Sequence, residues 1–164
     1  MTKEEDGNFA LILATWLGDK KVVELLLRHG AQTDAPGMTP SPLAVAALNF
    51  HLGVVDTLLY HGADTNVEVP FDDNRSCHPL EWAAITLNMG LLMVLVKHQA
   101  LEKYRGGENK LCPLAIAVKH GSLYMVEFLL KYGCRLGNLS EIIRDRRFRL
   151  SSEMRQLLGY YNLR

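Results

Sequence analysis

The sequence predicts an all-α solenoid made of four stacked helix–turn–helix repeats and a C-terminal capping helix pair. A segment with two short apolar runs recurs four times, and its first and last residues are 19 positions apart in every copy. The connections between the copies differ in length. Because stacked helices must align whereas surface connections can vary, a constant module with variable linkers indicates repeats that pack on one another. The copies are Leu11–Gly30, Leu43–Gly62, Leu80–Gln99 and Leu114–Gly133.

The fourth copy illustrates how each module folds. Pro113 suits the first turn of a helix, where its missing N–H has no helical partner. Gly121 can take the left-handed conformation that ends this helix, and Gly133 can end the second one. Both helices carry an apolar stripe at spacings of three and four. The stripes are Leu114, Ala117 and Val118 in the first helix and Val126, Leu129 and Leu130 in the second.

Alignment of the copies places the remaining elements. The first helix is expected to begin at Asn8, with Asp6 or Asn8 as its N-cap. In the C-terminal pair, Ser140 and Ser151 are the expected caps. Burial between helices is expected for Leu26, Leu59 and Leu130. The expected helices are 8–17 and 20–28, 42–49 and 52–60, 79–87 and 91–98, and 139–148 and 152–158.

Composition narrows the class of protein. The chain has 164 residues, the length of one domain, with 48% hydrophobic and 22% charged residues. No apolar run approaches the ~18 residues of a membrane span, and the acidic N-terminus is unlike a secretory signal. Three cysteines without a C-x-x-C pair favour a reducing compartment, so a cytoplasmic or nuclear location is expected. The zero net charge argues against a protein built to hold a polyanion.

The repeats resemble those of the ankyrin family, whose unit reads approximately T-P-L-H-x-A-A-x-x-G-H and then V-V-x-x-L-L-x-x-G-A. The resemblance covers about residues 6–134 and implies a single domain with repeats at about 7–35, 36–66, 67–102 and 103–135 and a cap at 136–164. Two features depart from the family: no copy keeps the histidine of T-P-L-H, and Phe50 and Leu87 replace the glycine that Gly18 and Gly121 keep. The matching segments are Ser41-Pro42-Leu43 with Ala46-Ala47, His78-Pro79-Leu80 with Ala83-Ala84, Cys112-Pro113-Leu114 with Ala117, Leu25–Ala31 and Leu58–Asp64.

The resemblance also implies a function and a surface. Ankyrin repeats imply non-catalytic recognition of another protein, through the concave face and the finger-like connections. The two residues after Ala-Ala line that face in the family, and an exposed apolar stripe with a polar rim is typical of a binding surface. Tilted helices could instead tuck some of these side chains into the core. The positions are Trp16 and Leu17, Leu48 and Asn49, Ile85 and Thr86, and Lys119 and His120.

The longest connection, residues 64–77, adds a second expected contact. Its tip is expected at Phe71, Asp72, Asp73 and Asn74. An aromatic side chain flanked by carboxylates suits a buried anchor with a charged rim. Residues 1–134 carry a net charge of −4 and residues 135–164 a net charge of +4. A basic partner segment would therefore suit the body of the molecule, and a monomer is expected.

Several other patterns favour structural roles. Trp82 aligns with apolar core positions and is expected to pack there. Cys112 and His120 lie at opposite ends of one helix, ~12 Å of rise apart, so they do not form a nucleophile–base pair. Stacked helices lie ~8–10 Å apart, so side chains at the same position of three successive repeats cannot all come within ~2.1 Å of one zinc ion. No cofactor or metal is therefore expected, although histidines recur at one repeat position, as His29, His61 and His98.

The arginine-rich segment Arg144–Arg149 leaves several interpretations open. It is expected to be a solvated capping face, with a contact for an acidic protein partner as the next alternative. Nucleic-acid binding is disfavoured because the cluster is short, contains Asp145 and has only Phe148 as a stacking aromatic. A ubiquitin-ligase adaptor is a further alternative, since ankyrin arrays precede a SOCS box in such adaptors. Leu139, Ile142, Ile143 and Arg144 are similar to the opening of that box, but its cysteine and Leu-Pro-Leu-Pro run are missing.

Overall fold

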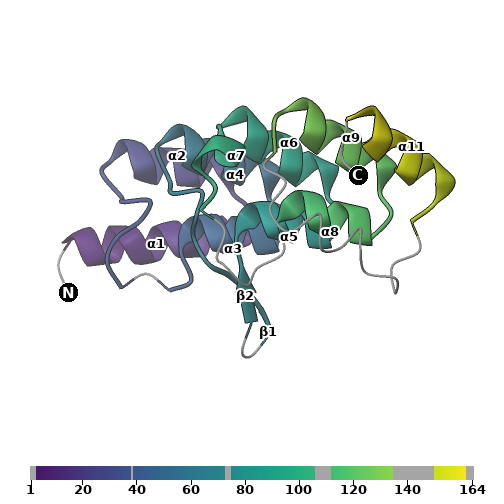
Figure 1. Cartoon of the computed structure of the whole chain (residues 1–164). Coiled ribbons are helices and arrows are strands. Elements are labelled where there is room, and N and C mark those ends of the chain that lie inside the picture. The colour runs from purple at the N-terminus through teal and green to yellow at the C-terminus, as the bar shows by residue number, and fades with distance from the viewer. Residues whose placement is uncertain (1–2, 38, 73–74, 106–111, 135–149, 162–164) are drawn as a thin grey trace.

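Two rows of helices lie side by side along the molecule (Figure 1). The structure, a computed structural model, describes residues 3–37, 39–72, 75–105, 112–134 and 150–161, with residues 3–6 described by their backbone alone. What we call the inner row contains α1 (Lys3–Leu17), α3 (Pro42–Leu48), α5 (Pro79–Ile85) and α8 (Pro113–Lys119). The outer row contains α2 (Lys20–Arg28), α4 (Leu52–Tyr60), α6 (Met89–Lys97), α9 (Leu123–Lys131) and α11 (Ser152–Tyr160). This is the all-α solenoid that the sequence predicted.

Three short elements lie outside the helix pairs. α7 (Ala100–Lys103) follows α6, and β1 (Val69–Asp72) pairs antiparallel with β2 (Arg75–Cys77). The hairpin projects from the inner row (Figure 1). Val69 pairs with Cys77, and both are buried, whereas Pro70 between them and the tip is exposed. One face of the hairpin therefore packs on the helices, which fixes its register. The sequence analysis predicted a long connection here but no strands.

Three of the inner helices, α3, α5 and α8, begin with proline at the first turn. The Ser41 hydroxyl accepts a hydrogen bond from a backbone N–H of α3 at 3.2 Å, and the Cys112 sulfur accepts one in α8 at 3.3 Å. At α5 the carboxylate of Glu81 accepts a hydrogen bond from the backbone N–H of His78 at 2.7 Å. These caps satisfy donors that have no partner within the helix, and each contributes about 1 kcal/mol.

The turn within each pair uses a left-handed residue, whether or not it is glycine. Gly18 and Gly121 have φ angles of 74° and 71°. Phe50 and Leu87 have φ angles of 55° and 53°, although a side chain makes this conformation costly by about 1–2 kcal/mol. The helix pairs therefore keep the turn geometry of the family where the glycine is lost, and the loss is absorbed as local strain.

The core lies between the two rows. Small residues such as Ala46 and Ala83 have no exposed surface, and they let neighbouring helices approach closely. Larger side chains fill the space beside them, and each fully buried one contributes about 1.5–3 kcal/mol. The equivalent leucines of the four inner helices are at most 1% exposed; they are Leu11, Leu43, Leu80 and Leu114.

The first helix is longer than predicted. It begins at Lys3 rather than Asn8, so neither Asp6 nor Asn8 is its N-cap. The acidic sequence near its start favours this longer helix, because negative charge suits the N-terminal end of the helix dipole. The side-chain oxygen of Asn8 instead accepts a hydrogen bond from the backbone N–H of Gln32 at 3.0 Å. Asn8 thus ties the connection after α2 to the inner row.

Two of the three leucines expected to be buried are only half-buried. Leu59 is buried, but Leu26 and Leu130 are not fully covered. Leu26 belongs to the first pair, which has a described neighbour on one side only. Leu130 lies on α9, which packs less closely against α6 than α4 does. Their partial exposure therefore comes from the spacing of the pairs, not from a wrong helix phase.

The C-terminal part of the structure begins at Leu150. Ser151 caps α11 as predicted, with its hydroxyl accepting a hydrogen bond from the backbone N–H of Met154 at 3.1 Å. The predicted helix at 139–148, its cap Ser140 and the segment Arg144–Arg149 lie outside the described residues. Within the described ranges, no helix has both the length and the apolar character that crossing a membrane requires.

Candidate protein-binding surface

Four equivalent positions run along the inner row, one on each helix. Trp16 of α1 is 60% exposed, and Lys119 of α8 is also exposed. Leu48 of α3 and Ile85 of α5 are half-buried and pack against the core. The predicted stripe therefore corresponds to a row of equivalent positions, and it is more accessible at its ends than in its middle.

Trp82 occupies a gap between α3 and α5. It stands on α5 at the position that Val45 and Ile116 hold on α3 and α8, where both of these are buried. The larger indole is half-buried and packs against the core, as predicted, with part of the ring left accessible. Helices α3 and α5 approach each other less closely than α1 and α3 or α5 and α8 do. The bulky indole thus stands where the two helices are less closely packed.

Three aromatic rings form a continuous band at this gap. The Trp82 ring stacks on Phe50 with centroids 6.3 Å apart and on Phe71 with centroids 5.8 Å apart. Such pairs contribute about 0.5–1.5 kcal/mol beyond the area that they bury. Phe50 follows α3 and Phe71 lies in β1, so the aromatic band (Phe50, Trp82 and Phe71) joins the helix turn to the hairpin. The sequence did not predict this arrangement.

Phe71 is enclosed rather than free at the hairpin tip. Its half-buried ring lies between Trp82 and the Arg75 guanidinium, whose carbon is 5.2 Å from the ring centroid. Antiparallel pairing sets Arg75 opposite Asp72, and two guanidinium nitrogens donate to one Asp72 oxygen at 2.9 and 2.5 Å. Asp73 lies outside the described residues. The aromatic side chain and the carboxylate therefore belong to one closed cluster with Arg75.

The second residue of each predicted pair stands at the end of its inner helix. Leu17 and His120 are exposed. The Asn49 side chain is exposed but donates to a carbonyl of its own helix at 2.9 Å, and the half-buried Thr86 hydroxyl does the same at 2.7 Å. Asn49 and Thr86 thus complete their helices, and Leu17 and His120 are the more available of the four.

Two exposed apolar residues that the sequence analysis did not assign to the surface lie at the helix turns. Phe50 is 39% exposed and Leu87 is 44% exposed. Each stands where the other repeats have the turn glycine, and this replacement is the sequence feature that could have identified them as surface residues. A bulky apolar residue in a strained, exposed turn contributes little to the core, so its presence is consistent with a contact surface.

A buried polar network supports the inner row beneath this surface. Glu81 is 2% exposed and accepts a hydrogen bond from the Tyr104 hydroxyl at 2.5 Å. Burial, followed by this hydrogen bond, raises the pKa of Tyr104. The Tyr104 ring also packs edge-on against His78, with centroids 5.7 Å apart. The network ties the segment after α7 to the start of α5, so its role is structural.

The recurring histidines end their helices, as predicted. They are the C-caps of α2, α4 and α6, and the first two place a ring nitrogen within 3.0 Å of a carbonyl of their own helix. In His98 the ring nitrogen Nε2 lies 2.8 Å from a carboxylate oxygen of Asp56 on the neighbouring outer helix. Among the described residues, no three His, Cys, Asp or Glu side chains are grouped so as to hold a metal ion.

The cysteines have structural surroundings. Cys112 caps the start of α8 and His120 caps its end, so the two stand at opposite ends of the helix. Burial, together with the nearby Cys112, raises the pKa of Cys134 to about 12. A buried thiol that stays protonated is a poor nucleophile. Cys77 is buried as well.

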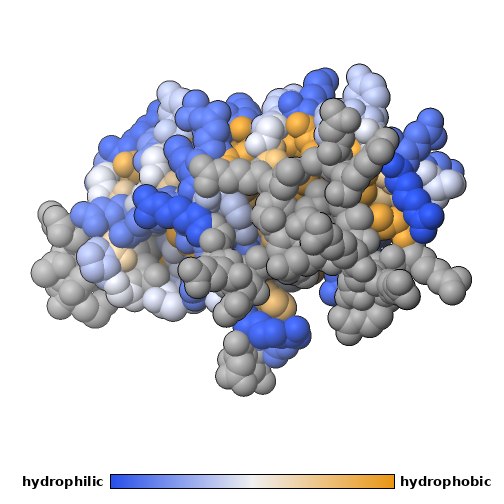
Figure 2. Space-filling model, in the orientation of Figure 1, coloured by the Kyte–Doolittle hydropathy of each residue, from blue (hydrophilic) through white to orange (hydrophobic). Residues whose placement is uncertain are grey.

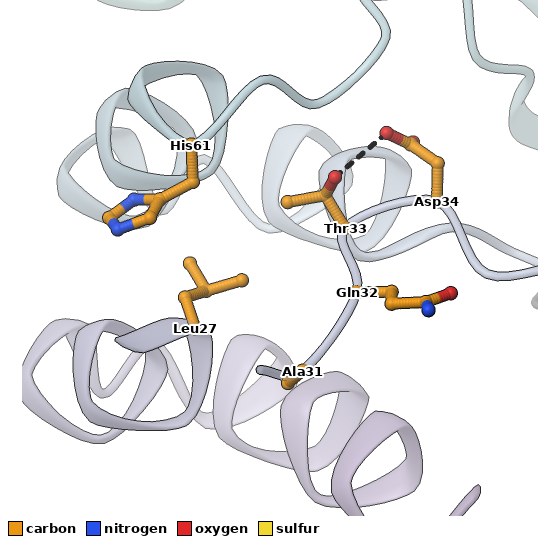
Figure 3. A pocket seen from close by; sticks show the side chains of 6 residues that line it. All are labelled: Leu27, Ala31, Gln32, Thr33, Asp34 and His61. Atoms are coloured by element: carbon orange, nitrogen blue, oxygen red, sulfur yellow. Dashed lines mark hydrogen bonds between the residues drawn. The ribbon is translucent and has the colours of Figure 1, made fainter. Parts of the chain in front are cut away.

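Two surface hollows lie along the outer row. One, of about 350 Å³, lies where Leu27 and His61 face the connection after α2, and Thr33 there donates to Asp34 at 2.9 Å (Figure 3). The other, of about 620 Å³, lies between α6 and α9, where apolar residues reach the surface (orange in Figure 2). It is lined by Met93, Val94, Val96, Lys97, Phe128 and Tyr132.

Comparison with known proteins identifies the family. The family described as "Ankyrin repeats (3 copies)" matches residues 1–69. Two ankyrin repeat proteins of fowlpox virus (strain NVSL) are similar: FPV031 is 30% identical over 80% of this chain and 39% of its own length, and FPV216 is 29% identical over 53% and 29%. The tyrosine-protein kinase Shark of Drosophila melanogaster is 33% identical over 71% of this chain and 12% of its own length.

The chain belongs to the ankyrin-repeat family, as its fold and these similarities show. Repeats of this family generally mediate protein–protein interaction. The chain spans well under half the length of these relatives. The kinase name describes a protein of which only 12% is matched, so it assigns no activity to this chain.

Proposed function

We propose that this chain is a non-catalytic module that binds another protein across the inner row of helices. The observation that carries the proposal is the exposed Trp16, which stands in one row with Leu48 and Ile85 and is followed by an exposed apolar residue, Leu17. Tryptophan anchors dominate the affinity of many interfaces. The half-buried Leu48 and Ile85 add apolar surface to the row that this anchor belongs to.

The aromatic band extends this surface toward the hairpin. Phe50 and Trp82 are partly exposed, and Trp82 of α5 stacks on Phe71 of the Phe71–Arg75–Asp72 cluster. Lys119 lies at the α8 end of the row and Arg75, paired with Asp72, lies in the hairpin, so neither is next to Trp16 in the chain. A partner that binds across the inner row would contact apolar side chains at the centre of the interface and charged side chains at its margin.

The charge of the connections favours a basic partner segment. Exposed acidic residues lie in the connections after α2 and α4 and in β1, and they include Asp34, Asp64, Glu68 and Asp72. Arg75 compensates Asp72, so the excess negative charge rests mainly on the other three. Complementary charge would raise the association rate more than it would strengthen the final complex.

Affinity capture with matched variants tests this proposal. The full chain, Trp16→Ala and Tyr160→Ala would serve as baits in lysate, with bound proteins identified by mass spectrometry. Tyr160 is an exposed aromatic residue on α11, far along the chain from the proposed surface. The proposal expects a partner that Trp16→Ala loses and Tyr160→Ala keeps. Equal capture by both variants would contradict it. The adaptor and nucleic-acid alternatives depend on residues 135–149, which lie outside the described residues.

A further inference from the structure

A polar bridge joins the outer helices α4 and α6. The Asp56 carboxylate of α4 lies 2.9 Å from the Lys97 ammonium at the end of α6. The same carboxylate oxygen lies 2.8 Å from the ring nitrogen Nε2 of His98, the C-cap of α6. The bridge therefore spans the junction between two successive helix pairs on the outer row.

The next junction, between α6 and α9, has lost this bridge. Alignment of the repeats places Met93 of α6 where α4 has Asp56. On α9, Lys131 and Tyr132 hold the positions of the lysine and the histidine that reach the carboxylate from α6. Met93 and Tyr132 are each 52% exposed. The junction has thus exchanged its carboxylate for an apolar side chain while keeping the lysine.

A hollow lies at this junction. α6 and α9 pack less closely than α4 and α6 do, and about 620 Å³ is open between them. Met93, Phe128 and Tyr132 line it, with the two aromatic rings in contact at a centroid distance of 4.5 Å. We call this hollow, with the lining residues given above, the outer groove (Figure 2). Its volume lies within the range of about 300–1,000 Å³ that is typical of binding pockets, so it can hold one or two large apolar side chains.

The charges around the outer groove are unbalanced at Lys131. Among the described residues this exposed lysine, on the last turn of α9, has no ion pair. Asp56 is engaged by Lys97, and Glu127 holds on α9 the position from which Asp56 faces the following pair, so it faces α11 and not α6. α7 lies on the α4 side of α6, because the Asn66 side chain donates a hydrogen bond to its last carbonyl at 3.0 Å.

We propose that the outer groove binds an acidic, amphipathic segment of a partner protein. An apolar side chain of that segment fills the hollow against Met93 and Phe128. A carboxylate beside it pairs with Lys131, as Asp56 pairs with Lys97 at the preceding junction. Methionine is flexible and polarizable, and it suits a surface that must fit an incoming side chain. This site lies on the outer row, so it does not depend on the proposed inner-row surface.

Fluorescence anisotropy of three labelled peptides with the full chain tests the groove. The peptides, of about 14 residues, share one stripe of Leu and Phe at helical spacing and carry Glu, Gln or Lys on the polar face. The Glu peptide should bind about 10-fold more tightly than the Lys peptide, and added salt should reduce this difference. Lys131→Gln should weaken the Glu peptide by about 2- to 5-fold and leave the Gln peptide unchanged.

Met93→Asp restores the carboxylate that the preceding junction has. The change puts a charge into the apolar lining and gives Lys131 a partner within the chain, so the affinity for the Glu peptide should fall by about 10-fold or more. Because Met93 is exposed, the fold should be kept, which circular dichroism and urea unfolding would check. Tyr60→Ala removes an 81% exposed aromatic at the end of α4, outside the groove, and is the control that should bind as wild type does.

Three results would overturn the proposal. The first is a Glu peptide that binds no more tightly than the Lys peptide, or that does not bind at concentrations up to about 1 mM. The second is a preference for Glu that Lys131→Gln does not reduce. The third is binding that Met93→Asp leaves unchanged, and its loss in Trp16→Ala would then place the peptide on the inner row. Binding that prefers Glu, falls in Met93→Asp and Lys131→Gln, and persists in Tyr60→Ala and Trp16→Ala supports the proposal.

Discussion

Phe71 of the hairpin and Trp82 of α5 stack with ring centroids 5.8 Å apart, and this contact holds the hairpin against the inner row. β1 and β2 form a two-stranded sheet with three paired positions, and so short a hairpin is marginally stable alone. The stack with Trp82 adds to the contact that the buried Val69 and Cys77 make with the helices. The geometry of the proposed binding surface therefore depends on an aromatic pair drawn from two separate segments.

Replacing Phe71 should affect both stability and the surroundings of Trp82. Because the Phe71 ring is only half-buried, Phe71→Ala should lower the free energy of unfolding by about 1–2 kcal/mol, less than a fully buried aromatic would. Phe71→Leu should cost less, since it keeps apolar contact without the stack. Urea unfolding measures the first effect, and the near-ultraviolet circular dichroism of the tryptophans reports the second. An unchanged signal in Phe71→Ala would show that the two rings do not meet in solution.

Leucines at different depths should differ in their contribution to stability. Leu59 is buried, so Leu59→Ala should lower the free energy of unfolding by about 2–5 kcal/mol. Leu26 and Leu130 are half-buried, and their alanine variants should each cost less than Leu59→Ala does. Chemical denaturation of the three variants ranks them directly. A larger loss at Leu26 than at Leu59 would contradict the described burial, or would show that the first pair is covered in solution.

The ion pair between α4 and α6 should make stability depend on pH. The Asp56 carboxylate lies 2.9 Å from the Lys97 ammonium, and Lys97 followed by His98 holds the pKa of Asp56 below its ordinary value of 3.8. A carboxyl whose pKa is lowered by folding stabilises the protein above its unfolded pKa, and this contribution is lost as the pH falls through its folded pKa.

Asp56→Asn should therefore destabilise the protein at pH 7 by about 0.2–1 kcal/mol, the range for a partly exposed pair. The difference between wild type and variant should shrink as the pH falls below 3.8. Urea unfolding across this pH range measures both values. Glu127→Gln, at an exposed position on α9, is the control for removing a carboxylate. A difference that persists unchanged at low pH would show that Asp56 acts through packing and not through its charge.

The solenoid could be predicted because the same periodic signals recur in every repeat. Apolar spacings of three and four, a proline at the helix start and a turn residue at a fixed offset are local features, and four aligned copies reinforce them. The bounds of α2 and α4 follow directly from that alignment. The start of α1 was misplaced because two capping residues, Asp6 and Asn8, stand inside the helix, and a cap signal does not exclude an earlier start.

The details of the candidate surface were harder to predict because they depend on contacts between repeats. The exposure of Trp16 followed from its repeat position, but the half-burial of Leu48 and Ile85 depends on helix spacing, which is wider between α3 and α5, where Trp82 stands. The pairing of Arg75 with Asp72 arises from hairpin register, which the short finger sequence did not specify.

The affinity of Trp16→Ala for a captured partner tests the central claim most directly. Isothermal titration calorimetry would compare this variant with wild type and with Tyr160→Ala. The proposed surface predicts that Trp16→Ala weakens binding by about 2 kcal/mol, roughly 30-fold in dissociation constant, while Tyr160→Ala binds as wild type does. Unchanged binding by Trp16→Ala, with binding abolished by Arg146→Ala and Arg147→Ala, would contradict the account and place the site in the basic C-terminal segment.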